Sequence, residues 1–322
     1  MKKLTLFTAF LMGAVSFAQV AKTSFEEPEA LSGEYTDTGD ANVAHDLINN
    51  TDEPLVDFLS TGDEMGFNAT YTPYDTPDVG LTDGDLVGVT DSKPSSTVTF
   101  TDGAKGYRMS DIDGNMKLEF DQVDLTVIIL ASISLDFLLS INSNATNGNY
   151  EGDGTVNSSG SDRLRIYVKD ITNNTEIDLF NSTGQDLDEF VPFSNGEYQL
   201  QWQNITENTP SSIVQLVIEG RTNAGTESFW FDNIFIDGLI GVNEQSAEQF
   251  AIYPNPATKG YVNITSKISG AKNVSIFDIL GKQVVKTSLS GDRLDVSGLK
   301  SGVYIVKIEQ GKASTTKKLI VK

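Results

Sequence analysis

The chain contains no cysteine and only one histidine, His45, among its 322 residues. The lack of cysteine excludes a disulfide framework, thiol catalysis and cysteine-ligated metal sites. With one histidine, a multi-histidine zinc site is impossible and any histidine-centred triad depends on His45. No serine or cysteine motif accompanies it, so we interpret His45 as a hydrogen-bonded structural or surface residue.

Basic residues are scarce before position 250. Residues 19–249 hold 9 Lys+Arg against 41 Asp+Glu, whereas residues 250–322 hold 12 against 4. An acidic body repels phosphates, so we expect no nucleic acid partner. Carboxylates in Gly- and Asp-rich loops suit calcium, and the alternative is that they keep a secreted protein soluble.

The sequence also lacks an apolar run that is long enough to span a membrane. Residues 125–141 are the most apolar stretch of the body, but they include an aspartate and three serines. At the N-terminus, lysines at 2–3 precede an apolar segment at 4–15 and an A-x-A-like site at 16–18. We therefore predict a signal peptide, residues 1–18, cleaved between Ala18 and Gln19, with an uncleaved anchor as the alternative. The mature chain is expected to have no transmembrane segment.

Alternating apolar and polar residues between Gly, Asn and Asp turns predict half-buried β-strands throughout the body. The predicted strands are 23–27, 67–71, 86–90, 97–100, 116–120, 125–141 (with a bulge near 132–134), 163–168, 198–203, 213–219 and 228–238. We predict an all-β protein, with an antiparallel jelly-roll β-sandwich at 19–238 as the acidic cargo domain. Residues 239–249 are polar and without periodicity, which is typical of an interdomain linker.

Two of these strands point unusual side chains away from their apolar faces. Arg163, Arg165 and Tyr167 share one face of the strand at 163–168, and Gln201 lies on the polar face of 198–203. Guanidinium groups, amides and an aromatic platform bind polar sugars, especially uronates. We therefore predict that these four residues bind a polysaccharide ligand. The alternative is a solvated face with cross-strand Arg–Glu pairs.

The last 73 residues contain short β-branched runs separated by glycine turns, which predict six or seven strands in a small Ig-like β-sandwich. Five ordered motifs in this segment resemble the type A C-terminal sorting domain of proteins exported by the type IX secretion system of Bacteroidetes. The residues singled out in these motifs are Tyr253, Pro254, Asn255, Pro256, Gly281, Gly302, Tyr304, Lys317 and Lys318. The resemblance implies that residues 250–322 direct the chain through the periplasm to the secretion machinery and the outer-membrane attachment apparatus. The protein would then be secreted or attached to the outer surface.

The two ends of the body resemble the first and last strands of galactose-binding-like jelly rolls, the fold of many carbohydrate-binding modules. The matching residues are Phe25-Glu26 and the segment 228–238. This resemblance implies a structural calcium ion beside the termini, with Glu26 and Asp232 as ligands. The alternative is that Glu26 is a surface charge and that Asp232 caps a turn.

No catalytic residues are assigned. The segment 176–181 resembles the catalytic strand of laminarinase-type glycoside hydrolases, but Asn181 stands where the acid is expected, and an amide cannot donate that proton. We therefore expect a non-catalytic module that binds glycan or cell-surface material. The alternatives are a glycosidase or polysaccharide lyase on the same fold, and a structural or adhesion protein of the cell surface.

Overall fold

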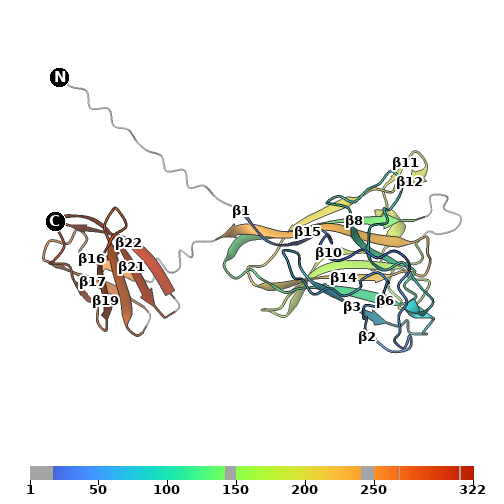
Figure 1. Ribbon diagram of the computed structural model, residues 1–322, viewed down its shortest axis with the longest axis horizontal. Helices are drawn as coiled ribbons and strands as arrows, with labels where there is room; N and C mark the ends of the chain where they lie inside the picture. The colour runs from blue at the N-terminus through green and yellow to red at the C-terminus, as the bar shows by residue number, and fades with distance from the viewer. Residues whose placement is uncertain (1–16, 142–149, 241–249, 268, 312) are drawn as a thin grey trace, which may run out of the picture. The chain divides into compact units, whose positions relative to one another are not determined.

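The computed structural model describes residues 17–141, 150–240 and 250–322, except residues 268 and 312. The chain forms two compact units, residues 1–240 and 241–322, and both consist of β-strands joined by loops (Figure 1). Within the described residues the helical segments are two short 3-10 helices, Gly80–Thr82 and Leu187–Phe190. Neither has the length and apolarity needed to cross a membrane. The predicted all-β class is confirmed.

The first unit is built on two large antiparallel sheets, in addition to a short two-stranded hairpin. The six-stranded sheet has the order β13-β8-β15-β5-β4, with β1 also paired to β15. Its strands are β1 (Phe17–Thr23), β4 (Gly88–Thr90), β5 (Gly106–Ser110), β8 (Ile128–Ser140), β13 (Gln203–Asn208) and β15 (Ser228–Ile240). The seven-stranded sheet has the order β10-β9-β14-β6-β3-β2, with β7 also paired to β14. Its strands are β2 (His45–Asp46), β3 (Phe67–Thr72), β6 (Asn115–Phe120), β7 (Val123–Asp124), β9 (Arg163–Asp170), β10 (Thr175–Asn181) and β14 (Ile213–Arg221).

The chain crosses repeatedly between these sheets. It passes from β7 to β8 to β9, and later from β13 to β14 to β15, changing sheet at each step. Such crossing is the connectivity of a jelly roll, in which each sheet combines strands that are distant in sequence. The predicted antiparallel jelly-roll sandwich is confirmed.

The period-two pattern of the strands places the core between the sheets. Val214, Leu216 and Ile218 of β14 are buried and share one core cluster with Phe229 and Phe231 of β15. Burying a side chain of this size stabilises the fold by roughly 1.5–3 kcal/mol. The intervening residues of β14 point to the outer face of the seven-stranded sheet, which is free to carry polar groups.

Three predicted strands of the body are wrong in whole or in part. Residues 24–27 of the predicted strand 23–27 form no strand, since β1 ends at Thr23. Residues 97–100 form no strand, because the Val98 amide donates to the Ser95 hydroxyl and closes a local turn. Within 198–203, Tyr198 ends the short hairpin strand β12 (Glu197–Tyr198), which pairs with β11 (Phe193–Ser194), and Gln203 begins β13. Residues 199–202 belong to no strand, and β12 and β13 belong to different sheets, so the predicted strand spans parts of two separate strands.

The second unit is a small sandwich of three and four antiparallel strands, which confirms the predicted Ig-like fold. The smaller sheet has the order β16-β17-β20, and the larger one has the order β19-β18-β21-β22. The strands are β16 (Phe250–Tyr253), β17 (Tyr261–Ser266), β18 (Lys272–Phe277), β19 (Gln283–Leu289), β20 (Arg293–Asp295), β21 (Gly302–Gln310) and β22 (Ala313–Val321). Apolar residues of both sheets form a single core cluster.

The first and last sorting motifs meet in this fold. The Asn255 side-chain amide donates to the Lys318 carbonyl at 2.7 Å, and the Ile320 amide donates to Asn255 Oδ1 at 2.9 Å. Asn255 therefore holds the segment after β16 against β22. Elsewhere, Gly281 adopts a φ of 82° in the turn between β18 and β19, a conformation that glycine adopts without strain.

Both ends of the first unit adjoin residues outside the described ranges. Residues 1–16 of the expected signal peptide are not described, whereas Phe17 and Ala18 begin β1 and pair with Leu239 and Gly238 of β15. The expected linker at 239–249 overlaps the end of β15 at its first two residues, and its remainder, 241–249, lies outside the described residues.

Candidate functional site

The outer face of the seven-stranded sheet gathers most of the basic side chains of the body. Residues 19–240 contain nine Lys and Arg, and five of them lie on β6, β9 and β14 of this sheet. The five are Lys117, Arg163, Arg165, Lys169 and Arg221. The strand register places Arg163 beside Arg221, Arg165 beside Glu219, and Glu219 beside Lys117.

Arg165 and Tyr167 are held by neighbouring carboxylates. Arg165 donates from Nη2 to Glu176 at 2.8 Å and from Nε to Asp178 at 2.7 Å. Its guanidinium carbon lies 4.0 Å from the centre of the Tyr167 ring, and the Tyr167 hydroxyl donates to Glu219 at 2.8 Å. Burial and Glu219 raise the pKa of Tyr167 well above its ordinary value. The acidic pair at 176 and 178, which resembled a hydrolase strand, thus serves as the ion-pair partner of Arg165.

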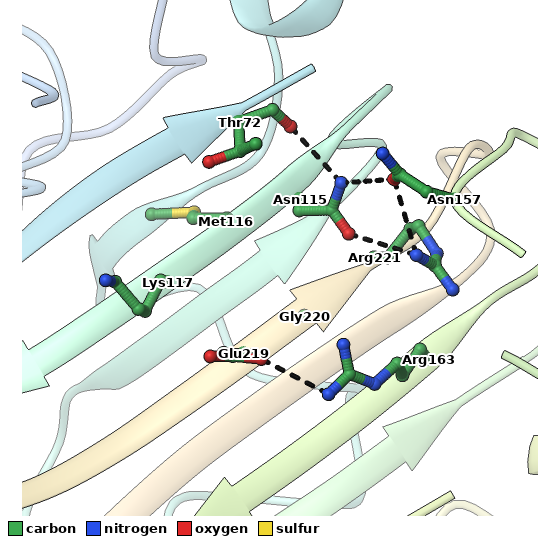
Figure 2. A pocket seen from close by; sticks show the side chains of 9 residues that line it. All are labelled: Thr72, Asn115, Met116, Lys117, Asn157, Arg163, Glu219, Gly220 and Arg221. Carbon is green, nitrogen blue, oxygen red and sulfur yellow. Dashed lines mark hydrogen bonds and ion pairs between the residues drawn. The ribbon is translucent and has the colours of Figure 1, made fainter. Parts of the chain in front are cut away.

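A cavity of about 350 Å³ opens on this face beside Arg163 (Figure 2). Its lining residues are Thr72, Asn115, Met116, Lys117, Asn157, Arg163, Glu219, Gly220 and Arg221. Arg163 donates from Nε to the Thr183 hydroxyl at 2.9 Å, and its Nη2 lies 3.3 Å from Glu219 Oε2. Three cationic side chains therefore share a small space with one carboxylate.

Arg221 is the buried member of this set, with 4% of its surface exposed. Its guanidinium donates to the Ser161 carbonyl at 2.5 Å, the Gly154 carbonyl at 2.9 Å and Asn115 Oδ1 at 3.1 Å. All of these acceptors are neutral, and within the described residues no carboxylate oxygen lies within 4.0 Å of the guanidinium. Burial, together with repulsion from Arg163, lowers the pKa of Arg221.

The sequence prediction located one edge of this cavity and missed the rest. Arg163 lines it, while Arg165 and Tyr167 lie farther along β9. Gln201 is exposed between β12 and β13, and β13 pairs with β8 in the other sheet, so the structure does not bring Gln201 to the cavity. Arg221 could have been found by extending the alternation of β14 by two residues beyond Glu219, whereas nothing local indicated Asn157.

His45 lies away from this cavity, on β2 at the far edge of the sheet. Its Nε2 is 2.8 Å from Asp37 Oδ2 and its Nδ1 is 2.6 Å from the Val43 carbonyl oxygen. Partial burial lowers the pKa of His45, but the contacts with Val43 and Asp37 outweigh it, so that the net pKa is raised. Strands β14, β6 and β3 separate β2 from β9, so His45 forms no catalytic group with Arg163 or Tyr167.

Glu26 and Asp232 both accept hydrogen bonds from the backbone amides of one loop, residues 101–105. Fully buried Asp232 accepts three hydrogen bonds on Oδ2, from the Thr101 amide (2.6 Å), the Thr101 hydroxyl (3.0 Å) and the Asp102 amide (2.9 Å). Burial raises the pKa of Asp232 to about 6, although these hydrogen bonds act in the opposite direction. Glu26 accepts the amides of residues 104 and 105 on Oε1 at 2.6 and 2.7 Å. Gly103 has a φ of +79°, and a Cβ there would lie 2.4 Å from Glu26 Oε1.

The amides of this loop donate to one oxygen of each carboxylate, Asp232 Oδ2 and Glu26 Oε1, and would compete with a calcium ion for these oxygens. A Ca²⁺ ion needs six to eight oxygen ligands. In the part of the chain that the structure describes, no three His, Asp or Glu side chains are grouped to hold a metal ion. The structural calcium ion implied by the resemblance therefore stays a prediction for experiment.

The Glu26→Gln variant tests the role of this residue. We expect it to lower the melting temperature of the full chain by an equal amount in calcium and in chelator, at a cost of about 1 kcal/mol, because a neutral amide oxygen accepts the two backbone hydrogen bonds more weakly than the carboxylate oxygen does. Melting curves in both buffers measure this. A rise in melting temperature with calcium that Glu26→Gln abolishes would show instead that Glu26 is a calcium ligand.

Comparison with known proteins places the second unit in a family. Residues 251–322 match the secretion system C-terminal sorting domain. Over 105 residues, 31% of this chain, the sequence is 30% identical to an endo-acting ulvan lyase of Formosa agariphila, and the match spans 20% of that protein.

Two solved structures are similar to parts of the chain. One is PorZ, a surface component of the type IX secretion system of Porphyromonas gingivalis, with 20% identity over 27% of this chain and 14% of PorZ, and a TM-score of 0.21. The other is TmCBM61, solved with β-1,4-galactotriose, with 12% identity over 53% of this chain and 86% of that protein, and a TM-score of 0.28. Together, the five ordered motifs and the family match over 251–322 identify this segment as a type IX secretion system C-terminal sorting domain, and the chain is a protein that this system sorts to the outer surface or beyond.

Proposed function

We propose that residues 19–240 form a non-catalytic module that binds polysaccharide once the sorting domain has directed the chain out of the cell. The observation that carries the proposal is the cavity on the outer face of the seven-stranded sheet, where Lys117, Arg163 and Arg221 meet. A cavity of about 350 Å³ lies at the small end of the range for ligand sites, so it suits part of a polymer, such as one sugar unit. The strands beside the cavity carry charged side chains such as Glu119, Arg165 and Lys169, which suits a surface that meets a hydrated chain.

The charge distribution supports this role. A polysaccharide in water is hydrated, and binding must replace the hydrogen bonds that it makes to water. A binding site therefore benefits from hydrogen-bond donors that are already held in place before the ligand arrives. Arg163 is fixed by Thr183 and Glu219, and Arg221 by four carbonyl or amide oxygens. Fixed donors of this kind lose little conformational entropy on binding.

The test is affinity electrophoresis of the full mature chain through gels containing ulvan, polygalacturonate, alginate or dextran. We expect retardation by at least one polymer, and about tenfold weaker binding for Arg163→Ala, which removes a charged donor from the cavity. Arg165→Ala is the matched control on the same strand and face. The guanidinium of Arg165 already forms ion pairs with Glu176 and Asp178. Its removal is therefore expected to change the affinity for the polysaccharide less than twofold. Failure to bind any polysaccharide would overturn the proposal.

A polysaccharide lyase is the second candidate, favoured by the segment that is 30% identical to an endo-acting ulvan lyase. Against it, Glu219 is the one carboxylate among the cavity-lining residues, and His45 is remote on β2. Two carboxylates would be needed for glycoside hydrolysis. A lyase instead needs a base beside the sugar's acidic proton, and the residues that line the cavity include neither histidine nor tyrosine for that role. Incubating the chain with ulvan and measuring new chain ends by absorbance distinguishes the two candidates, because a binding module releases none.

A further inference from the structure

The side chains of the cavity that still have unused hydrogen-bond donors are the positively charged ones. The Asn115 side-chain amide already donates to the Thr72 carbonyl and to Asn157 Oδ1. The Asn157 amide donates to the Pro73 carbonyl at 3.1 Å and to Asp75 at 3.0 Å. Both neutral amides that line the cavity are therefore engaged in holding its walls. A ligand therefore gains no partner from these two amides without displacing one of these contacts.

The cationic groups keep donors to spare. Arg163 Nη1 has no hydrogen-bond partner among the residues that the structure describes, since its contacts run from Nε and Nη2. Lys117 Nζ lies 3.4 Å from Glu119 Oε2, and the lysine side chain is 34% exposed. Each can therefore donate to a ligand without giving up its present partner.

The one carboxylate of the cavity does not balance its cations. Glu219 is shared between the Tyr167 hydroxyl and Arg163. Arg221 behind it is nearly buried and donates hydrogen bonds only to neutral acceptors, while the carboxylates of Asp162 and Asp75 act on its charge from beyond ion-pair distance. A buried charge in low dielectric creates a stronger field than an exposed one, and this field favours an anion in the cavity.

We propose that this cavity binds the negatively charged substituent of an acidic polysaccharide, a carboxylate or a sulfate, between Lys117 Nζ and the Arg163 guanidinium with Arg221 behind it. This inference rests on the proposed function and names its ligand class. Carboxylate and sulfate share the chemistry that matters here, an anionic group with several oxygens that accept charge-assisted hydrogen bonds. The planar guanidinium of Arg163 can supply two parallel donors to either group.

Matched pairs of polymers test this ligand class with the full mature chain. Polygalacturonate and its methyl ester differ in the charge of each carboxyl group, and dextran sulfate and dextran differ in sulfate. We expect the charged polymer of at least one pair to bind ten or more times tighter than its neutral partner. Preference within the first pair assigns a carboxylate, and preference within the second assigns a sulfate.

Three variants separate the cavity from general charge attraction. Lys117→Gln and Arg163→Gln are each expected to weaken binding of the charged polymer about tenfold, and both side chains are exposed enough for the fold to survive, as a melting curve checks. Lys93→Gln removes one charge from an exposed loop between strands of the other sheet and is expected to change affinity less than twofold. Equal binding of charged and neutral polymers, or equal losses in all three variants, would overturn the inference while leaving polysaccharide binding in place. No binding to any polymer would overturn both.

Discussion

Deleting residues 250–322 is expected to leave the protein in the periplasm of a bacterium that has a type IX secretion system, while the full chain reaches the outer surface or the medium. The deletion removes the complete second unit, including all seven of its strands and the first and last sorting motifs. The first unit has its own core, so the truncated chain should still fold and accumulate. Fractionation followed by immunoblotting of the body measures the outcome.

A single substitution tests whether export needs the correctly folded sorting domain and not only the presence of its sequence. Asn255→Ala removes the side chain that joins the segment after β16 to β22, through its contacts with Lys318 and Ile320. We expect reduced export of this variant.

For the deletion itself, export of the truncated chain at the level of the full chain would contradict the assignment of a sorting function to residues 250–322.

Replacing Asp232 with alanine is expected to destabilise the first unit by about 3–5 kcal/mol, since it leaves the amides of Thr101, Asp102 and Asn233 without their acceptor. The effect should depend on pH. Because burial raises the pKa of Asp232 to about 6, the folded state holds a proton more tightly than the unfolded chain. The stability due to this residue is therefore fully present below pH 4 and falls as the pH rises to about 6.

The loss in Asp232→Ala should accordingly be greatest near pH 4 and smaller above pH 6. Urea unfolding at several pH values measures this trend. Asp237→Ala is the control, on the same strand, where the carboxylate accepts one hydrogen bond, from the Ser132 hydroxyl at 2.6 Å. It is expected to cost about 1 kcal/mol. A loss in Asp232→Ala no larger than that of the control would show that the loop at 101–105 does not depend on this carboxylate.

The alternation of apolar and polar residues predicted which side chains share one face of a strand. It did not predict which strands lie next to each other in a sheet. The pattern at 163–168 correctly placed Arg163, Arg165 and Tyr167 outside the core cluster, although Tyr167 is only 2% exposed and has the Arg165 guanidinium over its ring. It did not show that Glu219 would be shared by two of these side chains, because strand order depends on pairing between segments that are far apart in sequence. For the same reason it did not show that Gln201 would lie apart from these side chains, before a strand, β13, that joins the opposite sheet.

The sorting domain was predictable in greater detail because its signal is local. Each of its motifs occupies a few consecutive residues, such as the turn at Gly281 or the entry to β21. The cavity in the first unit has no such signature. It combines side chains from β6, β9 and β14 with Asn157 from a loop, and nothing in the immediate sequence of Asn157 or Arg221 marks them as neighbours.

The concentration of basic side chains on one sheet has a consequence for how the molecule meets a polyanion. Five of the nine Lys and Arg between residues 19 and 240 lie on the strands of that sheet, in a segment with an excess of carboxylates. An acidic polymer would be repelled from most approaches and drawn in from one, so encounters would be oriented before contact is made. Added salt should then slow association far more than it speeds dissociation, and the rate of capture would follow the ionic strength of the medium.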